Sequence, residues 1–295
     1  AASDVYKRQN PDGPYHWFKV NWINKSTGYL GREKTAKVRA EAAAKGLEAG
    51  LKNILYVHFT MDDNLSLSEE IKARYRSMYT GVFFKRYILG LWAMAEGIIY
   101  DMFDADKHVQ KITDFFRCLK DGGRYVSCDY GTQNATVFLL WNKGNNGKWY
   151  CVREYYYSGR AKGKQKTDGE YADDFEKWLD GVPIRAVIVD PAAASFIAEL
   201  GKRGYRVLKA DNDVEDGIRE VASMLNMGLL VFCDTCINTI MEFGSYIWDE
   251  KAAQRGEDRP VKENDHAMDA VRYFVYTILS KRTGRVKNKA KHGFD

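Results

Sequence analysis

The chain has 295 residues, of which 45% are hydrophobic and 29% are charged. These fractions are near the globular average and exclude collagen-like, low-complexity and highly charged disordered classes for the chain as a whole. The length predicts about two domains. No apolar run approaches the ~18 residues that a membrane helix needs, no signal peptide opens the sequence, and five cysteines in a long chain argue against a disulfide framework.

The net charge of +5 is mildly basic and is compatible with a polyanionic partner. The basic residues are concentrated at the end of the chain. From Lys281 onward there are six Lys or Arg residues against one Asp. We therefore expect residues 283–295 to form a basic tail, which is either simply solvated or contacts phosphates if the preceding domain handles nucleic acid.

The first residues do not read as a natural protein start. Asp4–Gln9 resembles the translation of a sequencing adapter, so we expect residues 1–9 to be a non-native leader and an upstream part to be missing. After it, the pattern predicts a helix over 35–51, a strand over 53–59 and a helix over 67–78. The string GxxxxGK[ST] does not occur, so we expect no ATP hydrolysis by this chain alone.

From about Leu119 onward, strands and helices alternate, which predicts an α/β fold. Three strands with short connections, 124–129, 136–141 and 149–157, predict an antiparallel meander. A helix over 167–179 begins with a capping box formed by Thr167 and Glu170. The later predicted elements are a buried strand over 185–190, a helix over 195–203, a strand over 206–210, a helix over 214–227, a short strand over 229–233, and helices over 237–253 and 265–281.

Two acidic residues stand at the ends of hydrophobic strands. Asp129 closes the first strand of the predicted meander, and Asp190 closes the buried strand that follows it. Ligands of open α/β sheets collect at the carboxyl ends of strands. Each aspartate is therefore either a turn or helix cap or a functional carboxylate.

A third polar group opens the last predicted helix. At 100° per residue, Asp265, Asp269 and His266 fall in one sector, beside a stripe of apolar residues. Capping of the helix N-terminus by acids explains Asp265 well, but it explains Asp269 less well because the effect fades after the first turn.

Carboxylates from three separate elements suit a magnesium or manganese site, because these ions prefer hard oxygen ligands. Two such ions ~3.5–4 Å apart stabilise the attacking and leaving oxygens of a phosphodiester displacement. The pattern therefore suits a divalent-metal site.

Several sequence blocks carry a family resemblance when they are taken in order. They are NPDGPYHW, HFTMDDNLSLSEEIKARY, FKRYILGLWAMAEGIIYDMFD, VSCDYGTQNATVFLLW, VIVDPAAASFIAEL and NDHAMDAVRYF. Together they resemble a PBSX-type phage terminase large subunit, in which an N-terminal ATPase motor drives DNA into a capsid and a ribonuclease-H-like domain cuts the concatemer. The resemblance implies that residues 10–118 are the end of the ATPase domain with its linker and that 119–282 are the nuclease domain.

The resemblance also implies roles for individual residues. Asp129 corresponds to the first metal carboxylate, Asp190 to the second, and the pair His266 and Asp269 to the third, while Asp265 is an additional acid that binds metal through water or only caps the helix. The implied cofactors are two Mg²⁺ or Mn²⁺ ions. The implied partners are double-stranded viral DNA, the small terminase subunit and the portal protein, with no membrane, in the cytoplasm of a bacterial host. ATP binding is expected of the full-length parent protein only.

Basic residues that could border a DNA groove stand after the meander, on the helix over 195–203 and in the strand over 206–210. They are Lys162, Lys164, Lys166, Lys202, Arg203 and Lys209. Each is otherwise a solvated surface residue. Two alternatives to the terminase endonuclease stay open: another ribonuclease-H-like nuclease of the integrase or resolvase type, and a catalytically silent module that docks on the portal.

Overall fold

The computed structural model describes residues 10–28, 40–41, 43–44, 52–131 and 134–280. The chain divides into two compact units, one made of residues 1–101 and 247–261 and the other of residues 102–246 and 262–295. The predicted leader 1–9, most of the predicted helix 35–51 and the basic tail 283–295 lie outside the described residues.

The first unit consists of short elements. They are α1 (Trp17–Asn21), β1 (Ser26–Gly28) paired in parallel with β2 (Lys52–Leu55), α3 (Glu69–Ser77), α4 (Gly81–Phe83) and α12 (Glu250–Gln254). The predicted helix over 67–78 is confirmed as α3, which begins where the Ser68 hydroxyl accepts a hydrogen bond from the Ile71 amide. Within this unit the buried Arg86 donates to the Ala93 carbonyl and pairs with Asp258.

The second unit is built on a seven-stranded mixed sheet in the order β3-β9-β6-β5-β4-β7-β8. Its strands are β3 (Val109–Gln110), β4 (Tyr125–Asp129), β5 (Ala135–Lys143), β6 (Trp149–Ser158), β7 (Ala186–Val189), β8 (Val207–Lys209) and β9 (Leu230–Cys233). The antiparallel pairs β4–β5 and β5–β6 confirm the predicted meander, and β7 joins β4 in parallel.

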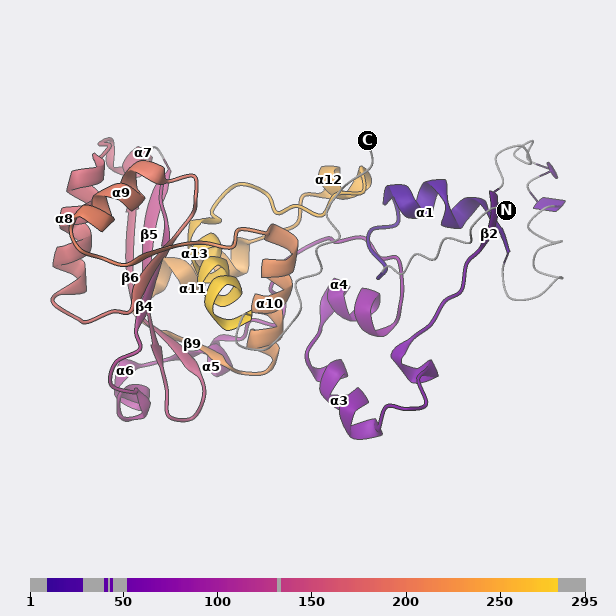
Figure 1. The fold of residues 1–295 in the computed structure, drawn as a ribbon, viewed down its shortest axis with the longest axis horizontal. Helices are drawn as coiled ribbons and strands as arrows, with labels where there is room; N and C mark the ends of the chain where they lie inside the picture. Colours follow the sequence, from indigo (N-terminus) through magenta and orange to yellow (C-terminus); the bar gives the residue numbers. More distant parts are fainter. Residues whose placement is uncertain (1–9, 29–39, 42, 45–51, 132–133, 281–295) are drawn as a thin grey trace. The chain divides into compact units, whose positions relative to one another are not determined.

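Helices cover both faces of this sheet. The helices of this unit are α5 (Ala105–His108), α6 (Ile112–Phe115), α7 (Gly159–Lys162), α8 (Asp168–Leu179), α9 (Ala194–Lys202), α10 (Val214–Asn226), α11 (Ile237–Ser245) and α13 (His266–Phe274), the last continued by a π-helical turn to Leu279. Figure 1 shows α8 and α9 on one face and α10, α11 and α13 on the other. The unit is therefore a three-layer α/β/α structure.

The face under α8 and α9 is an apolar core. Alternate strand residues contribute Val126, Cys128, Phe138 and Leu140, and β7 adds two valines. The helices contribute Tyr171, Phe175, Phe196 and Leu200. The predicted capping box of α8 is confirmed, because the Thr167 hydroxyl accepts from the Glu170 amide while the Glu170 carboxylate accepts from the Thr167 amide.

The opposite face packs against α13. The Trp141 ring stacks on Phe274 with centroids 4.4 Å apart, and the Trp141 indole donates to the Ser127 hydroxyl. Successive strand residues point to opposite faces, so Ser127 and Asp129 share the face that α13 covers. The strand period thus directs the Asp129 carboxylate toward α13.

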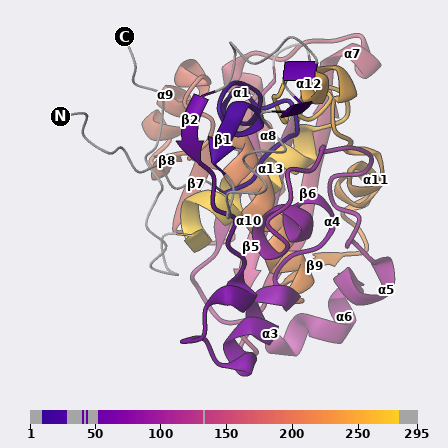
Figure 2. The ribbon, with the colours of Figure 1, turned by 90° about the vertical axis from the view of Figure 1, so that its right-hand side faces the viewer.

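Most strands of this sheet run in the same direction and therefore end at the same edge. Because β5 is antiparallel to its two neighbours and the other pairs are parallel, β4, β6, β7, β8 and β9 all finish at the same end of the sheet, which we call the carboxyl edge. Figures 1 and 2 place α7, which follows β6, and α6 at opposite ends of this sheet. Among the described residues, every helix is too short or too polar to span a lipid bilayer.

Candidate functional site

Two of the predicted acids are neighbours at the carboxyl edge. The last register pair between β4 and β7 is Cys128 with Val189, so Asp129 and Asp190 occupy the next position on two adjacent parallel strands. One Asp190 oxygen accepts from the Ala192 amide at 2.7 Å and fixes the turn into α9. Its other oxygen is available to groups from α13.

The helix α13 brings the third group to the same edge. His266 Nδ1 lies 3.0 Å from Asp129 Oδ2, which links the helix start to the end of β4. Asp269, one turn later, is buried, and its Oδ1 accepts from Arg272 Nη2 at 2.8 Å. The structure therefore brings the predicted His266 and Asp269 to the edge that carries Asp129 and Asp190.

Tyr273 connects the helix to the second strand acid. Its hydroxyl donates to Asp190 Oδ2 at 2.7 Å. Burial and the charges of Asp269 and Asp129 raise the pKa of Tyr273, so the phenol keeps its proton and acts as a donor. This one side chain thus lies within the electrostatic reach of all three predicted carboxylates.

The N-terminus of α13 is capped by another helix. The Glu242 carboxylate of α11 accepts from the amides of Ala267 and Met268 at 2.7 and 3.3 Å. Asp265 occupies the N-cap position, but its side chain makes no capping hydrogen bond. Asp265 thus stands at the cap position without supplying the side-chain hydrogen bond of a cap. Its buried carboxylate instead pairs with Lys262 at 3.0 Å.

The electrostatics of the site favour a bound cation. Burial, together with the charges of Asp269 and Asp265, raises the pKa of Asp129 to about 6, although the hydrogen bond from His266 opposes the shift. Burial lowers the pKa of His266, but the hydrogen bond and charge of Asp129 outweigh this, and the net shift is upward. The carboxylate of Asp129 is thus incompletely compensated by positive charge.

The ligand atoms of the three acids are not gathered on one point. Among the described residues, the carboxylate oxygens of Asp129, Asp190 and Asp269 do not all lie within 4.8 Å of one another. Each acid is instead paired with a side chain of α13, and Asp269 is also paired with Lys262, which precedes that helix. The donor set nevertheless fits Mg²⁺ or Mn²⁺, because it consists of hard oxygens on three rigid elements.

The predicted DNA-contacting residues differ in their surroundings. Lys164 and Lys202 lie 3.5 and 3.8 Å from single glutamates, Lys166 pairs with Asp174, and Arg203 pairs with three carboxylates at 2.7, 2.8 and 3.0 Å. Lys162 ends α7 and Lys209 ends β8, both at the carboxyl edge and both exposed. The DNA role of all six residues stays a prediction, and the geometry favours Lys162 and Lys209 for it.

Three residues of this site were missed by the sequence reasoning. Tyr273 follows Asp269 by four residues, so helical spacing was a signal for it, whereas Lys262 lies before the helix and only its nearness in sequence to Asp265 pointed to it. Glu242 lies far away in the sequence, and no local pattern relates it to α13.

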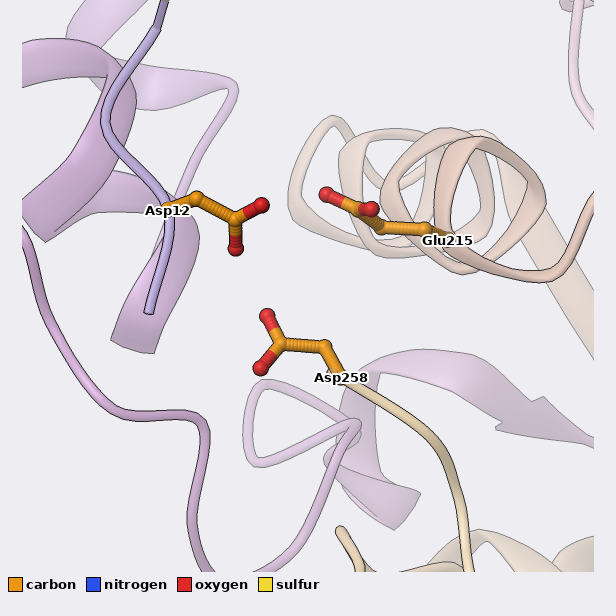
Figure 3. A group of neighbouring side chains, drawn as sticks. All are labelled: Asp12, Glu215 and Asp258. Atoms are coloured by element: carbon orange, nitrogen blue, oxygen red, sulfur yellow. The ribbon is translucent and has the colours of Figure 1, made fainter. Parts of the chain in front are cut away.

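Three further acidic residues each lie within their own unit. Figure 3 shows Asp12, Asp258 and Glu215. Asp12 and Asp258 belong to the first unit, where Arg86 Nη1 lies 3.1 Å from Asp12 Oδ1 and also pairs with Asp258. Glu215 belongs to α10 of the second unit. The local pairing with Arg86 accounts for the two aspartates, and we assign no site to the trio.

Comparison with known proteins identifies relatives of this site. Residues 131–277 match the family described as "Terminase RNaseH-like domain". The chain is 26% identical over 250 residues to the large terminase subunit of Escherichia phage T5, covering 81% of this chain and 55% of that protein. The solved large terminase of a thermophilic bacteriophage, in complex with ADP, is 52% identical with a TM-score of 0.78, covering 92% of this chain and 61% of that chain. Another crystal form of the same thermophilic phage protein is 53% identical with a TM-score of 0.78, covering 92% of this chain and 60% of that chain.

These matches confirm the predicted fold class and the resemblance to phage large terminases. The chain spans between 55% and 61% of the length of these relatives.

Proposed function

We propose, on the premise that residues 131–277 match the family "Terminase RNaseH-like domain", that the chain is a fragment of a phage large terminase subunit that cuts concatemeric viral DNA during packaging. The activity we assign to it is that of a divalent-metal-dependent endodeoxyribonuclease. ATP hydrolysis belongs, in this proposal, to the full-length parent protein.

The observation that carries this proposal is the meeting of β4, β7 and α13 at the carboxyl edge. Asp129 and Asp190 end adjacent parallel strands, and α13 brings Asp269 and His266 to them. Ligand sites of α/β sheets form at such strand ends. A catalytically silent docking module would have no need of carboxylates at one edge where burial, followed by the charges of Asp269 and Asp265, raises the pKa of Asp129 to about 6 against the hydrogen bond from His266.

We assign metal binding to Asp129, Asp190 and Asp269, with His266 and Asp265 as auxiliary residues. When bound, Mg²⁺ or Mn²⁺ supplies an activated water and stabilises the departing 3′ oxygen. Asp190 is oriented by Tyr273 and by the Ala192 amide, so its carboxylate is preorganised. His266 Nδ1 is engaged with Asp129, and no described residue hydrogen bonds to its Nε2, which is therefore available to orient a water molecule.

The wider assignments follow from the relatives. Residues 10–118 are proposed as the C-terminal remnant of the ATPase domain with its linker, because the similarity to the large terminase of the thermophilic phage extends over 92% of this chain. Double-stranded viral DNA, the small terminase subunit and the portal are the proposed partners, in the cytoplasm of the bacterial host.

Plasmid cleavage in Mn²⁺ tests the proposal. We expect the chain to nick and linearise supercoiled DNA, and we expect Asp129→Ala, Asp190→Ala and Asp269→Ala each to lower the rate by roughly 100-fold or more. Asp121→Ala is the matched control, because Asp121 is an exposed aspartate that lies just before the start of β4, the strand that ends at Asp129.

The proposal fails if wild type and the three variants are equally inert over a range of Mn²⁺ concentrations. That outcome would favour the docking module. Equal loss in Asp121→Ala would instead point to a general effect of removing surface charge.

A further inference from the structure

One ammonium group lies between two carboxylates at the start of α13. Lys262 Nζ is 3.0 Å from Asp265 Oδ2 and 3.3 Å from Asp269 Oδ2. The side chains of the two aspartates are 6% and 11% exposed, whereas the lysine side chain is 64% exposed. Lys262 thus reaches from the solvent to two buried negative charges.

The second cation near these acids has a different character. Arg272 is 2% exposed, donates to Asp269 Oδ1 at 2.8 Å and also donates to the carbonyls of Asn212 and Asp213. These hydrogen bonds make it a fixed part of the core. Lys262 has a flexible stem and reaches the acids from the solvent side, so it can leave them without unfolding the helix.

Asp265 is free to serve a cation because its capping role is taken. Glu242 accepts from the first amides of α13, and the Asp265 side chain makes no capping bond. Its carboxylate is paired with Lys262 instead. A buried carboxylate whose cationic partner is exposed can exchange that partner for another cation.

We propose that Lys262 competes with the divalent ion for Asp265 and Asp269 and thereby lowers the metal affinity of the nuclease site. This inference rests on the proposed function, since it assumes that these acids bind a divalent ion. Two cations repel each other at the same carboxylates, so the metal must displace the ammonium group before it binds. Lys262 holds the acids together without metal and moves aside when metal arrives.

Calorimetric titration of the full chain with Mn²⁺, in the absence of DNA, tests this. We expect Lys262→Met to lower the Kd for Mn²⁺ about fivefold or more, because the competing charge is gone. Lys262→Arg, which keeps the charge, should stay near the wild-type Kd. Lys148→Met, in the β5–β6 connection at the other end of the sheet, should have no effect.

Thermal unfolding is a second readout. Without metal, Lys262→Met should unfold at a lower Tm than wild type, because two buried carboxylates lose their partner, and Mn²⁺ should raise its Tm more than that of wild type. If Lys262→Met does not fold, Lys262→Gln replaces it in both measurements.

The outcomes separate the two proposals. If wild type and Lys262→Met bind Mn²⁺ with equal Kd, or the variant binds more weakly, competition by Lys262 is overturned and the metal-dependent function stands. If no form of the chain binds Mn²⁺, the proposed function fails and this inference fails with it.

Discussion

Tyr273 is the side chain through which α13 reaches Asp190. Its hydroxyl donates at 2.7 Å, and its pKa is raised by burial and by neighbouring carboxylates, so the donor persists at neutral pH. Asp190 follows a strand and has a turn amide as its other partner. Without the phenol, one oxygen of Asp190 would lose the donor that fixes its direction.

Removing this hydroxyl gives a prediction at the residue scale. Tyr273→Phe should lower the rate of plasmid cleavage roughly tenfold, because a hydrogen bond to a charged group is worth about 1.5–3 kcal/mol and part of that orients Asp190. The measurement is the cleavage rate as a function of Mn²⁺ concentration, and half-maximal activity should shift to higher Mn²⁺.

Tyr276→Phe is the matched control for this change, since its hydroxyl lies 3.3 Å from Asp216, on α10. Equal rates for Tyr273→Phe and wild type would show that Asp190 does not depend on the phenol.

The capping of α13 by α11 is the main interaction at the scale of elements. A helix start leaves unpaired amide groups, and Glu242 supplies the acceptor for two of them while Tyr156 donates to its other oxygen at 2.9 Å. Burial raises the pKa of Glu242 to about 7, even though these donors oppose the shift. The cap is therefore protonated in the folded chain at a pH where an ordinary glutamate is ionised.

The raised pKa of Glu242 predicts how the stability of the fold changes with pH, and thermal unfolding can test this. A folded-state pKa above the unfolded value stabilises the fold at low pH, and this stability is lost as the pH rises from about 4.3 through about 7. Glu242→Gln cannot ionise. We expect its Tm relative to wild type to rise between pH 5 and pH 8, corresponding to roughly 3 kcal/mol at most.

Glu170→Gln is the control, because the pKa of Glu170 is shifted downward rather than upward. Hydrogen bonds from the Thr167 amide and hydroxyl lower the pKa of the exposed Glu170, so its contribution is present above the unfolded pKa and is lost only in more acidic solution. The Tm difference for Glu170→Gln should stay flat from pH 5 to pH 8. A flat difference for Glu242→Gln as well would contradict the raised pKa of that carboxyl.

At the scale of the second unit, the sheet collects acids and bases at one edge. The strands β4, β7 and β8 finish there, in that order, and carry or precede Asp129, Asp190 and Lys209. Lys162 lies on α7, directly after β6. The arrangement places exposed positive charge on the same edge as the proposed nuclease site, as expected for a phosphate-contacting surface.

Salt titration of DNA binding tests this surface. Binding to a random-sequence duplex should weaken steeply with NaCl, and the double change Lys162→Met and Lys209→Met should reduce the slope of log Kd against log salt by about 1–2. Lys148→Met, at the other end of the sheet, should leave the slope unchanged. A flat salt response in the wild type would contradict a phosphate-dominated surface.

Much of the second unit was predictable because its information is local. Alternating and continuous apolar runs predicted the meander and β7, and the capping box at Thr167 predicted the start of α8. The acids at Asp129, Asp190 and Asp269 were singled out because they end strands or begin a helix. These features depend on neighbours within a few residues, which the sequence displays directly.

Tertiary structure decided which of those acids meet and which partners hold them. The parallel pairing of β7 with β4 makes Asp129 and Asp190 neighbours, and the packing of α11 on α13 lets Glu242 cap the helix and leaves Asp265 to Lys262. The contacts of β7 with β4 and of α11 with α13 join segments tens of residues apart, and their energy comes from burial of whole faces rather than from any local spacing. The sequence by itself thus determined the chemistry of the donors, whereas their pairing was decided by the fold.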